Sequence, residues 1–199
     1  MTLIGMRRAQ SAIVSAMGSP AARRLPGVSP ARVLLIGMMG SGKSSVGRAL
    51  AERTGWPFVD NDELVQRATG RTARELVADG GEPALRAAES AALGEGVRIE
   101  PPVIVATAAG TILDPDDRRL LDDSGLAVWL RAPINVLVDR AAGAEHRPWL
   151  ETDPAGWMAT ALAAREPLYA SIADLEIDTS RVAPRDAAEL VVHRLADDT

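Results

Sequence analysis

Cysteine is absent from the 199-residue chain, and aromatic residues make up only 3% of it. The lack of cysteine excludes disulfide bonds, cysteine-ligated zinc and a cysteine nucleophile. The scarcity of aromatic side chains argues against the stacking platforms that bind single-stranded nucleic acid. No apolar run approaches the roughly 20 residues that a membrane-spanning helix needs. Because one domain usually holds about 100–200 residues, we expect a single globular domain.

Positive charge is also in short supply, because 27 acidic residues outweigh 22 basic ones and give a net charge of −5. This balance argues against general binding to nucleic acid. The first 32 residues differ, since they hold five arginines and no acid. We therefore expect a disordered basic extension over residues 1–31 and the folded domain over residues 32–199. A signal peptide and a start site assigned too early are alternatives, but a chain without cysteine is compatible with the cytoplasm, where we expect it.

Lysine is almost missing, since Lys43 is the one lysine among 22 basic residues. An ammonium group is a compact point charge, so this lone lysine indicates a site where a planar guanidinium does not fit. Lys43 belongs to Gly37-Met38-Met39-Gly40-Ser41-Gly42-Lys43-Ser44, a full G-x-x-x-x-G-K-[ST] match. An apolar run at 33–36 precedes the match, and a helical pattern that ends at Gly55 follows it. Strand, loop and helix in this order predict a phosphate-binding loop.

In such a loop, glycines let backbone N–H groups turn toward phosphate oxygens, and the helix N-terminus adds partial positive charge. Lys43 would reach the β- and γ-phosphates, and the Ser44 hydroxyl would ligate Mg²⁺. The sequence therefore predicts ATP and Mg²⁺ as cofactors. The loop residues expected to hold the nucleotide are Gly40, Ser41, Gly42, Lys43, Ser44 and Ser45.

Five short apolar runs are typical of strands, and helical patterns separate them. The runs lie at 33–36, 57–60, 103–107, 126–130 and 175–178. This alternation predicts a three-layer α/β fold, with a five-stranded, mainly parallel sheet covered by helices on both faces. Ligands bind such sheets at the carboxyl ends of the strands, so we expect the functional residues directly after each run.

Two carboxylates, Asp60 and Asp62, follow the second run. In a functional interpretation, one of them faces Mg²⁺ and the other faces the substrate. An Asx turn or a helix N-cap would explain the same residues, because 63–68 has a helical pattern. The sequence alone leaves both interpretations open.

Arginines on later segments also have two interpretations. Arg86 and Glu89 are spaced i,i+3, so they form either a surface ion pair or a guanidinium fork that is held ready for an anion. Arg140 and Arg147 lie on either side of Gly143. They belong either to a mobile lid at about 140–155, which brings Arg147 onto the transferring phosphoryl group, or to a solvated helix.

In combination, these motifs resemble those of the shikimate kinases, small relatives of the nucleoside monophosphate kinases. The likeness covers about 33–195 and rests on six matches in the same order. The matches are the phosphate-binding loop, Asp60-Asn61-Asp62, Leu85-Arg86-Ala87-Ala88-Glu89, Arg140 with Arg147-Pro148-Trp149-Leu150, Arg165-Glu166-Pro167-Leu168-Tyr169, and Thr179-Ser180-Arg181-Val182-Ala183-Pro184.

The resemblance implies roles for the acidic residues and for the loop. Asp60 would help Ser44 to hold Mg²⁺. Asp62 would bind a substrate hydroxyl and act as the base. The implied catalytic residues are Lys43, Asp62 and Arg147.

The resemblance also implies how the two substrates are held. Arg86 and Arg165 would bind the carboxylate of shikimate, while Arg140 and Arg181 would contact the nucleotide. The family carries Gly-Gly-Gly after its third strand, where backbone amides touch the substrate, and this chain has Ala108-Ala109-Gly110. Alanine keeps the N–H group but disfavours a positive φ, which would cost about 1–2 kcal/mol. We therefore expect either strain in this substrate-binding turn or a different backbone path.

The expected activity is Mg²⁺-dependent transfer of the γ-phosphoryl group of ATP to a hydroxyl of a small carboxylated polyol, with shikimate as the first candidate. The expected partner is this small molecule, without nucleic acid or membrane, and the expected state is a monomer. The two alanines leave two alternatives. One is a kinase for another cyclitol acid or a gluconate-type acid, and the other is a nucleotide-binding protein of this type without kinase activity.

Overall fold

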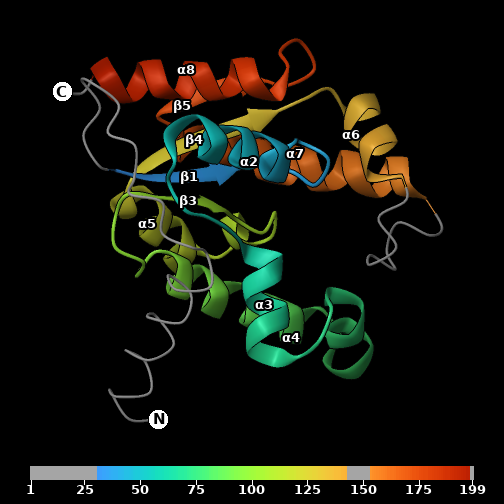
Figure 1. Ribbon diagram of the computed structural model, residues 1–199. Coiled ribbons are helices and arrows are strands. Elements are labelled where there is room, and N and C mark those ends of the chain that lie inside the picture. Colours follow the sequence, from blue (N-terminus) through green and yellow to red (C-terminus); the bar gives the residue numbers. More distant parts are fainter. Residues whose placement is uncertain (1–30, 143–152, 198–199) are drawn as a thin grey trace, which may run out of the picture.

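The computed structural model describes residues 31–142 and 153–197. Its centre is a five-stranded sheet with the order β2-β3-β1-β4-β5, in which every pairing is parallel (Figure 1). Each strand differs from its predicted run by at most one residue at either end, so the expected strands are confirmed. The strands are β1 (Arg32–Ile36), β2 (Phe58–Asp60), β3 (Val103–Ala106), β4 (Leu126–Arg131) and β5 (Leu175–Asp178).

The central strand, β1, explains why the first apolar run does not alternate with polar residues. Leu34 pairs with Val105 of β3 on one side and with Ala127 of β4 on the other. Residues 33–36 are all buried. A strand that is covered on both faces needs apolar side chains at every position.

Helices cover both faces of the sheet, and the predicted three-layer α/β fold is confirmed. Figure 1 shows α8 above the sheet and α5 below it. The helices are α2 (Lys43–Thr54), α3 (Asn61–Thr69), α4 (Ala73–Gly96), α5 (Pro115–Ser124), α6 (Ile134–Ala141), α7 (Pro154–Ile172) and α8 (Pro184–Asp197), with a short 3-10 helix, η1, at Thr111–Leu113.

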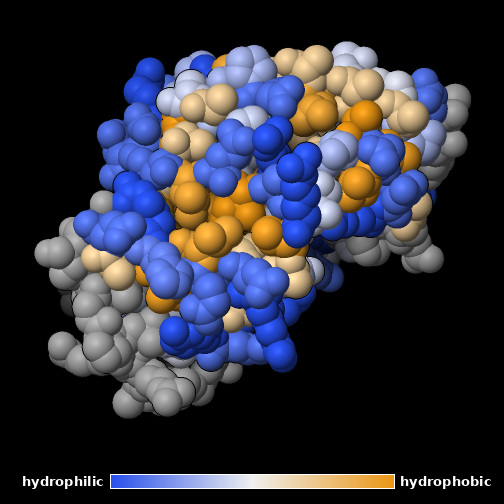
Figure 2. Space-filling view, turned by 90° about the horizontal axis from the view of Figure 1, so that it is seen from above, coloured by the Kyte–Doolittle hydropathy of each residue, from blue (hydrophilic) through white to orange (hydrophobic). Residues whose placement is uncertain are grey.

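Two apolar clusters hold the layers together. On one face, α2 and α8 contribute Val46 and Val191 to a cluster that includes Leu35 of β1. On the other face, α4, α5 and α7 pack against the sheet in a cluster that includes Leu34 and Leu93. Seen from above, on the side that α8 covers, apolar residues gather in the middle of the surface within hydrophilic surroundings (Figure 2).

Because the five strands run in the same direction, their carboxyl ends meet at one edge of the sheet. The phosphate-binding loop leaves β1 at this edge, Asp60 ends β2, and Thr107 and Thr179 follow β3 and β5. α3 and α4 pack against each other and project from the sheet (Figure 1). Within the described ranges, no helix is both long and apolar enough to span a membrane.

A pair of leucine substitutions tests how strongly the sheet depends on β1. Leu34 is fully buried, whereas Leu190 on α8 is 45% exposed. We expect Leu34→Ala to lower the free energy of unfolding by about 2–5 kcal/mol, because it leaves a cavity between two helical layers. Leu190→Ala should change it by no more than about 0.5 kcal/mol. Urea denaturation measures both, and equal losses would contradict the position of β1 at the centre.

Candidate active site

The loop between β1 and α2 surrounds the ammonium group of Lys43. Lys43 Nζ donates to the carbonyl oxygens of Gly37 and Met38, each at 2.9 Å. Gly40 and Gly42 have φ angles of 77° and 92°, which residues with a side chain disfavour. α2 begins at Lys43 itself, so the partial charge of the helix N-terminus adds to that of the ammonium group. This predicted phosphate-binding loop therefore has the backbone and the charge to bind a polyphosphate.

A hydrogen-bond network ties the loop to the end of β5. Arg140, in the last turn of α6, donates to the hydroxyl and carbonyl oxygens of Thr179, at 3.1 and 2.9 Å. The Thr179 hydroxyl in turn lies 3.0 Å from the carbonyl oxygen of Ser41. Arg181 differs, because 83% of its side chain is exposed and it forms an ion pair with Asp178 at 3.4 Å. Of the two arginines predicted at the nucleotide, Arg140 is fixed to the loop and Arg181 is open to solvent.

Ser44 and Asp60, the predicted metal ligands, lie in direct contact. The Ser44 hydroxyl donates to one carboxylate oxygen of Asp60 at 2.6 Å, and the other oxygen accepts from the Asp62 amide at 3.1 Å. Asp60 is thus the N-cap of α3, as one of the two interpretations predicted, and it is also a hydrogen-bond partner of Ser44.

The chemistry of this pair fits Mg²⁺. A hydroxyl and a carboxylate are the oxygen ligands that Mg²⁺ takes, usually with substrate phosphates and several waters. In the part of the chain that the structure describes, no group of three or more His, Asp or Glu side chains would form an all-protein metal site. The pair is therefore suited to a cation that arrives with a nucleotide.

A cleft of about 590 Å³ connects the phosphate-binding loop with α3 and α4. Ser41 is an exception among the predicted loop residues, because it is fully buried and does not line the cleft. The predicted site residues that line it are Gly40, Gly42, Lys43, Ser44, Ser45, Asp60, Asp62, Ala108, Ala109 and Arg140. The residues that the sequence did not single out include Val65, Gln66, Thr72 and Thr107.

The turn Ala108-Ala109-Gly110, which was predicted to bind the substrate, follows β3, and its first two residues line this cleft. The carbonyl oxygen of Ala108 accepts from the Thr111 hydroxyl at 2.8 Å, and that of Ala109 accepts from the Tyr169 hydroxyl at 2.9 Å. These bonds fix the orientation of the peptide groups. None of the three amides donates a hydrogen bond to another described residue. Because a buried amide without a partner is costly, the turn is suited to a ligand with acceptor oxygens.

The backbone of this turn settles the question that the two alanines raised. Among the described residues, only glycines have a positive φ, and Gly110 itself has a φ of −89°. Of the two outcomes expected for this turn, strain is therefore excluded, and the different backbone path remains. The turn follows a path that alanine adopts without cost, and its three amides remain available to donate hydrogen bonds to a ligand.

Gly110 lies directly against the guanidinium group of Arg86. A Cβ at this position would overlap Nη1 of Arg86. The same nitrogen donates to Glu89 Oε2 at 2.6 Å, and Nη2 donates to Glu82 Oε1 at 2.6 Å. Burial opposes the charge of Arg86, but Glu89 and Glu82 outweigh it and hold the pKa of the guanidinium above its usual value. The i,i+3 pair is therefore a fixed, charged fork.

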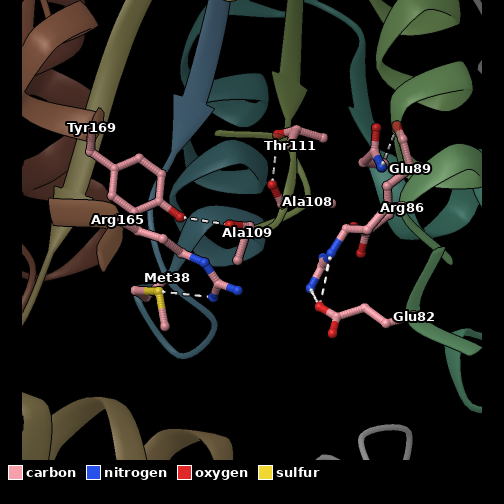
Figure 3. A network of polar contacts seen from close by, with 10 residues as sticks. Met38, Glu82, Arg86, Glu89, Ala108, Ala109, Thr111, Arg165 and Tyr169 are labelled. Carbon is pink, nitrogen blue, oxygen red and sulfur yellow. Dashed lines mark hydrogen bonds and ion pairs between the residues drawn. The ribbon is translucent and has the colours of Figure 1, made fainter. Parts of the chain in front are cut away.

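Arg165 of α7 lies on the other side of the same turn, across from Arg86 (Figure 3). The residue is buried, with Nη1 3.5 Å from the Met38 sulfur and Cζ 5.5 Å from the centre of the Trp157 ring. Burial lowers the pKa of this guanidinium, and Arg86 acts in the same direction. Its Nε has no hydrogen-bond partner, and no carboxylate pairs with it among the described residues. A buried guanidinium that no carboxylate of the described residues pairs with is suited to an anionic ligand.

Several of these contacts were missed from the sequence. The i,i+4 spacing of Glu82 and Arg86 is a signal that could have been used. The contacts of Met38, Trp157 and Tyr169 join segments far apart in the chain, and no local pattern reveals them. Arg147, the predicted catalytic arginine, lies outside the described residues, together with most of the predicted lid.

Substitutions of Thr179 test the network behind the phosphate-binding loop. Thr179→Val removes the hydroxyl at nearly constant volume, so the Ser41 carbonyl and an Arg140 N–H group lose their partner. We expect the free energy of unfolding to fall by about 1–3 kcal/mol. Thr179→Ser keeps the hydroxyl. Its free energy of unfolding, measured in the same urea denaturation experiment, should fall by less than half as much. A serine variant as unstable as the valine variant would show that the methyl group, and not the network, matters.

Comparison with known proteins agrees with this geometry. A sequence model of the shikimate kinase family matches residues 39–196. Shikimate kinase of Symbiobacterium thermophilum is 39% identical over 168 residues, which are 83% of this chain and 96% of that protein. Shikimate kinase from Acinetobacter baumannii in complex with shikimate has a TM-score of 0.81 at 31% identity, and the match covers 85% of this chain and 94% of that one.

A more distant solved structure is a gluconokinase from Sinorhizobium meliloti, with a TM-score of 0.55 at 26% identity over 88% of this chain and 97% of that one. The family match and the shikimate kinase relatives both extend over most of the chain, and the family match includes the strands β2 to β5. This protein therefore belongs to the shikimate kinase family, whose members are ATP-dependent kinases.

Proposed function

We propose that this protein transfers the γ-phosphoryl group of ATP to a hydroxyl group of shikimate. The observation that carries the proposal is the placement of Arg86 and Arg165 on either side of the three unused amides of 108–110 (Figure 3). Two guanidinium groups suit a planar carboxylate, and free amides suit the oxygens of a polyol. The structural similarity to a relative that was solved with shikimate supports the same ligand.

The nucleotide end of the cleft supports ATP as the phosphoryl donor. The residues proposed to bind it are Arg140, Arg181 and the loop residues Gly40, Ser41, Gly42, Lys43, Ser44 and Ser45. Ser44 and Asp60 would hold Mg²⁺ together with the phosphates, and the cation would neutralise the charge on the β- and γ-oxygens.

The chemistry that remains for the protein is positioning and charge compensation, because phosphoryl transfer passes through a loose transition state. Lys43 would reach the β- and γ-phosphates, and its two carbonyl contacts hold its ammonium group within the loop. Asp62 lines the same cleft from the first turn of α3. It would orient the attacking hydroxyl and take its proton late in the reaction.

A gluconate-type sugar acid is the second candidate acceptor, because a gluconokinase shares the fold. Shikimate is favoured, since the shikimate-bound relative superposes with a TM-score of 0.81 against 0.55 for the gluconokinase. A single chain is proposed as the working unit. The need for ATP and the net charge of −5 support a cytoplasmic enzyme without nucleic acid or membrane partners.

The proposal is tested by measuring ADP release in a coupled assay with shikimate, gluconate and no added acceptor. We expect turnover with shikimate well above both other reactions and its loss when EDTA removes Mg²⁺. Turnover with gluconate but not with shikimate would identify the sugar acid as the acceptor. ATP binding without turnover on either acid would contradict the proposed reaction.

Gly110→Ala tests the acceptor end of the cleft. The added methyl group displaces the Arg86 guanidinium, so the KM for shikimate should rise by at least about tenfold, as expected for the loss of a charged hydrogen bond. The KM for ATP should change little. Ala109→Gly is the matched control, because it removes a methyl group from the same turn and leaves Arg86 in place. Equal KM values for shikimate in the two variants would contradict the role of Arg86.

A further inference from the structure

Glu82 occupies a special point in α4. This helix consists of two parts that meet at Gly81, where φ is 71° and ψ is −174°, and Pro83 follows directly. A backbone with this φ is open mainly to glycine. Glu82 therefore stands at the start of the second part of the helix, one turn before Arg86, and its side chain reaches the guanidinium.

The N–H groups of Arg86 donate to two carboxylates, one buried and one largely exposed. Nη1 donates to Glu89 and lies against Gly110, so this side of the fork is closed by the protein itself. Nε and Nη2 both donate to Oε1 of Glu82, at 3.2 and 2.6 Å. An arginine can bind a carboxylate with two parallel hydrogen bonds through this second edge.

Exposure separates the roles of the two carboxylates. The Glu89 side chain is 2% exposed, so it is a fixed part of the fold, whereas the Glu82 side chain is 60% exposed. An ion pair with one such exposed partner contributes little stability and is readily exchanged. Glu82 is therefore able to leave the guanidinium at small cost, and Glu89 is not.

Glu82 also acts on the second arginine of the anion site. Figure 3 shows Arg165 and Arg86 on the two sides of the substrate-binding turn, with Glu82 beside Arg86. Burial lowers the pKa of Arg165, and Arg86 lowers it as well, whereas Glu82 and Glu89 raise it. Glu82 is thus the ion-pair partner of Arg86 and a more distant negative charge for Arg165.

We propose that Glu82 is an internal substitute for the acceptor carboxylate, which must displace it from the Nε and Nη2 edge of Arg86 in order to bind. This inference rests on the proposed function, because it assumes a carboxylated acceptor at the two arginines. Glu82 then lowers the affinity for the acceptor, whereas Glu89 raises it. Glu89 holds the fork in place, while Glu82 competes for it.

The test compares wild-type protein, Glu82→Gln and Glu95→Gln in steady-state assays with shikimate. Glu95→Gln removes one carboxylate from the same helix, away from the arginines, and should leave the kinetics unchanged. We expect Glu82→Gln to lower the KM for shikimate by about two- to fivefold, the size of a partly exposed ion pair, with little change in kcat or in the KM for ATP. Glu82→Ala should behave in the same way, and thermal unfolding shows that each variant is folded.

An acceptor without a carboxylate shows whether Glu82 competes with the acceptor or positions Arg86. In the shikimate analogue with a hydroxymethyl group in place of the carboxylate, no group competes with Glu82, so Glu82→Gln should give no gain in KM. An unchanged or higher KM for shikimate in Glu82→Gln would overturn the proposal and make Glu82 a positioning residue. An equal gain with the neutral analogue would overturn it as well.

A titration with benzoate in the absence of ATP tests the role of Glu82 independently of the proposed function, because it needs no phosphoryl transfer. Trp157 lies against Arg165, so tryptophan fluorescence is suited to follow the titration. Tighter benzoate binding by Glu82→Gln than by wild type supports competition even if wild type fails to phosphorylate shikimate. Unchanged or weaker benzoate binding overturns the role of Glu82, while turnover of shikimate by wild type leaves the proposed function intact.

Discussion

The acceptor end of this protein depends on one close approach, the contact of the Arg86 guanidinium with the backbone of Gly110. No side chain fits between them, and the buried carboxylate of Glu89 holds the guanidinium from behind. This contact joins α4, which projects from the sheet, to the turn that follows β3 (Figure 1). Across the turn, Tyr169 binds the Ala109 carbonyl and places α7, and with it Arg165, on the other side. The anion site is therefore defined by three elements that meet at one short turn.

The nucleotide end is organised by the parallel sheet. Each strand delivers its next residues to the same edge, and short polar links then tie neighbouring loops together. The Ser44–Asp60 bond joins the loops after β1 and β2, while Thr179 joins the loops after β1 and β5. Asp60 also caps α3, so the residue that is proposed to hold the cation fixes the first turn of the helix that carries Asp62. The proposed metal site and the proposed base are in this way placed by one carboxylate.

The sequence predicted the sheet closely because buried parallel strands are short, uniformly apolar and separated by helical patterns. It also located the phosphate-binding loop, since the glycine spacing and the lone lysine leave few other interpretations. It was less informative about the turn after β3, where the two alanines left strain and a different backbone path as alternatives, and the backbone has no strain of this kind. The path of that turn depends on Tyr169 and Thr111, and a contact across 60 residues leaves no local pattern. The Arg86–Glu89 spacing was noticed, whereas Glu82, on the same helix face, was not.

The single lysine has a consequence for the chemistry of the whole chain. Lys43 carries the one ε-amine, because all other basic side chains with a fixed charge are guanidinium groups. Reagents that acylate amines therefore meet one side chain only, and that side chain lies at the centre of the phosphate-binding loop. Every lysine-directed modification of this protein is then a modification of its nucleotide site. The fraction of Lys43 that is labelled therefore reports the fraction of molecules without a bound nucleotide, and no engineered probe is needed.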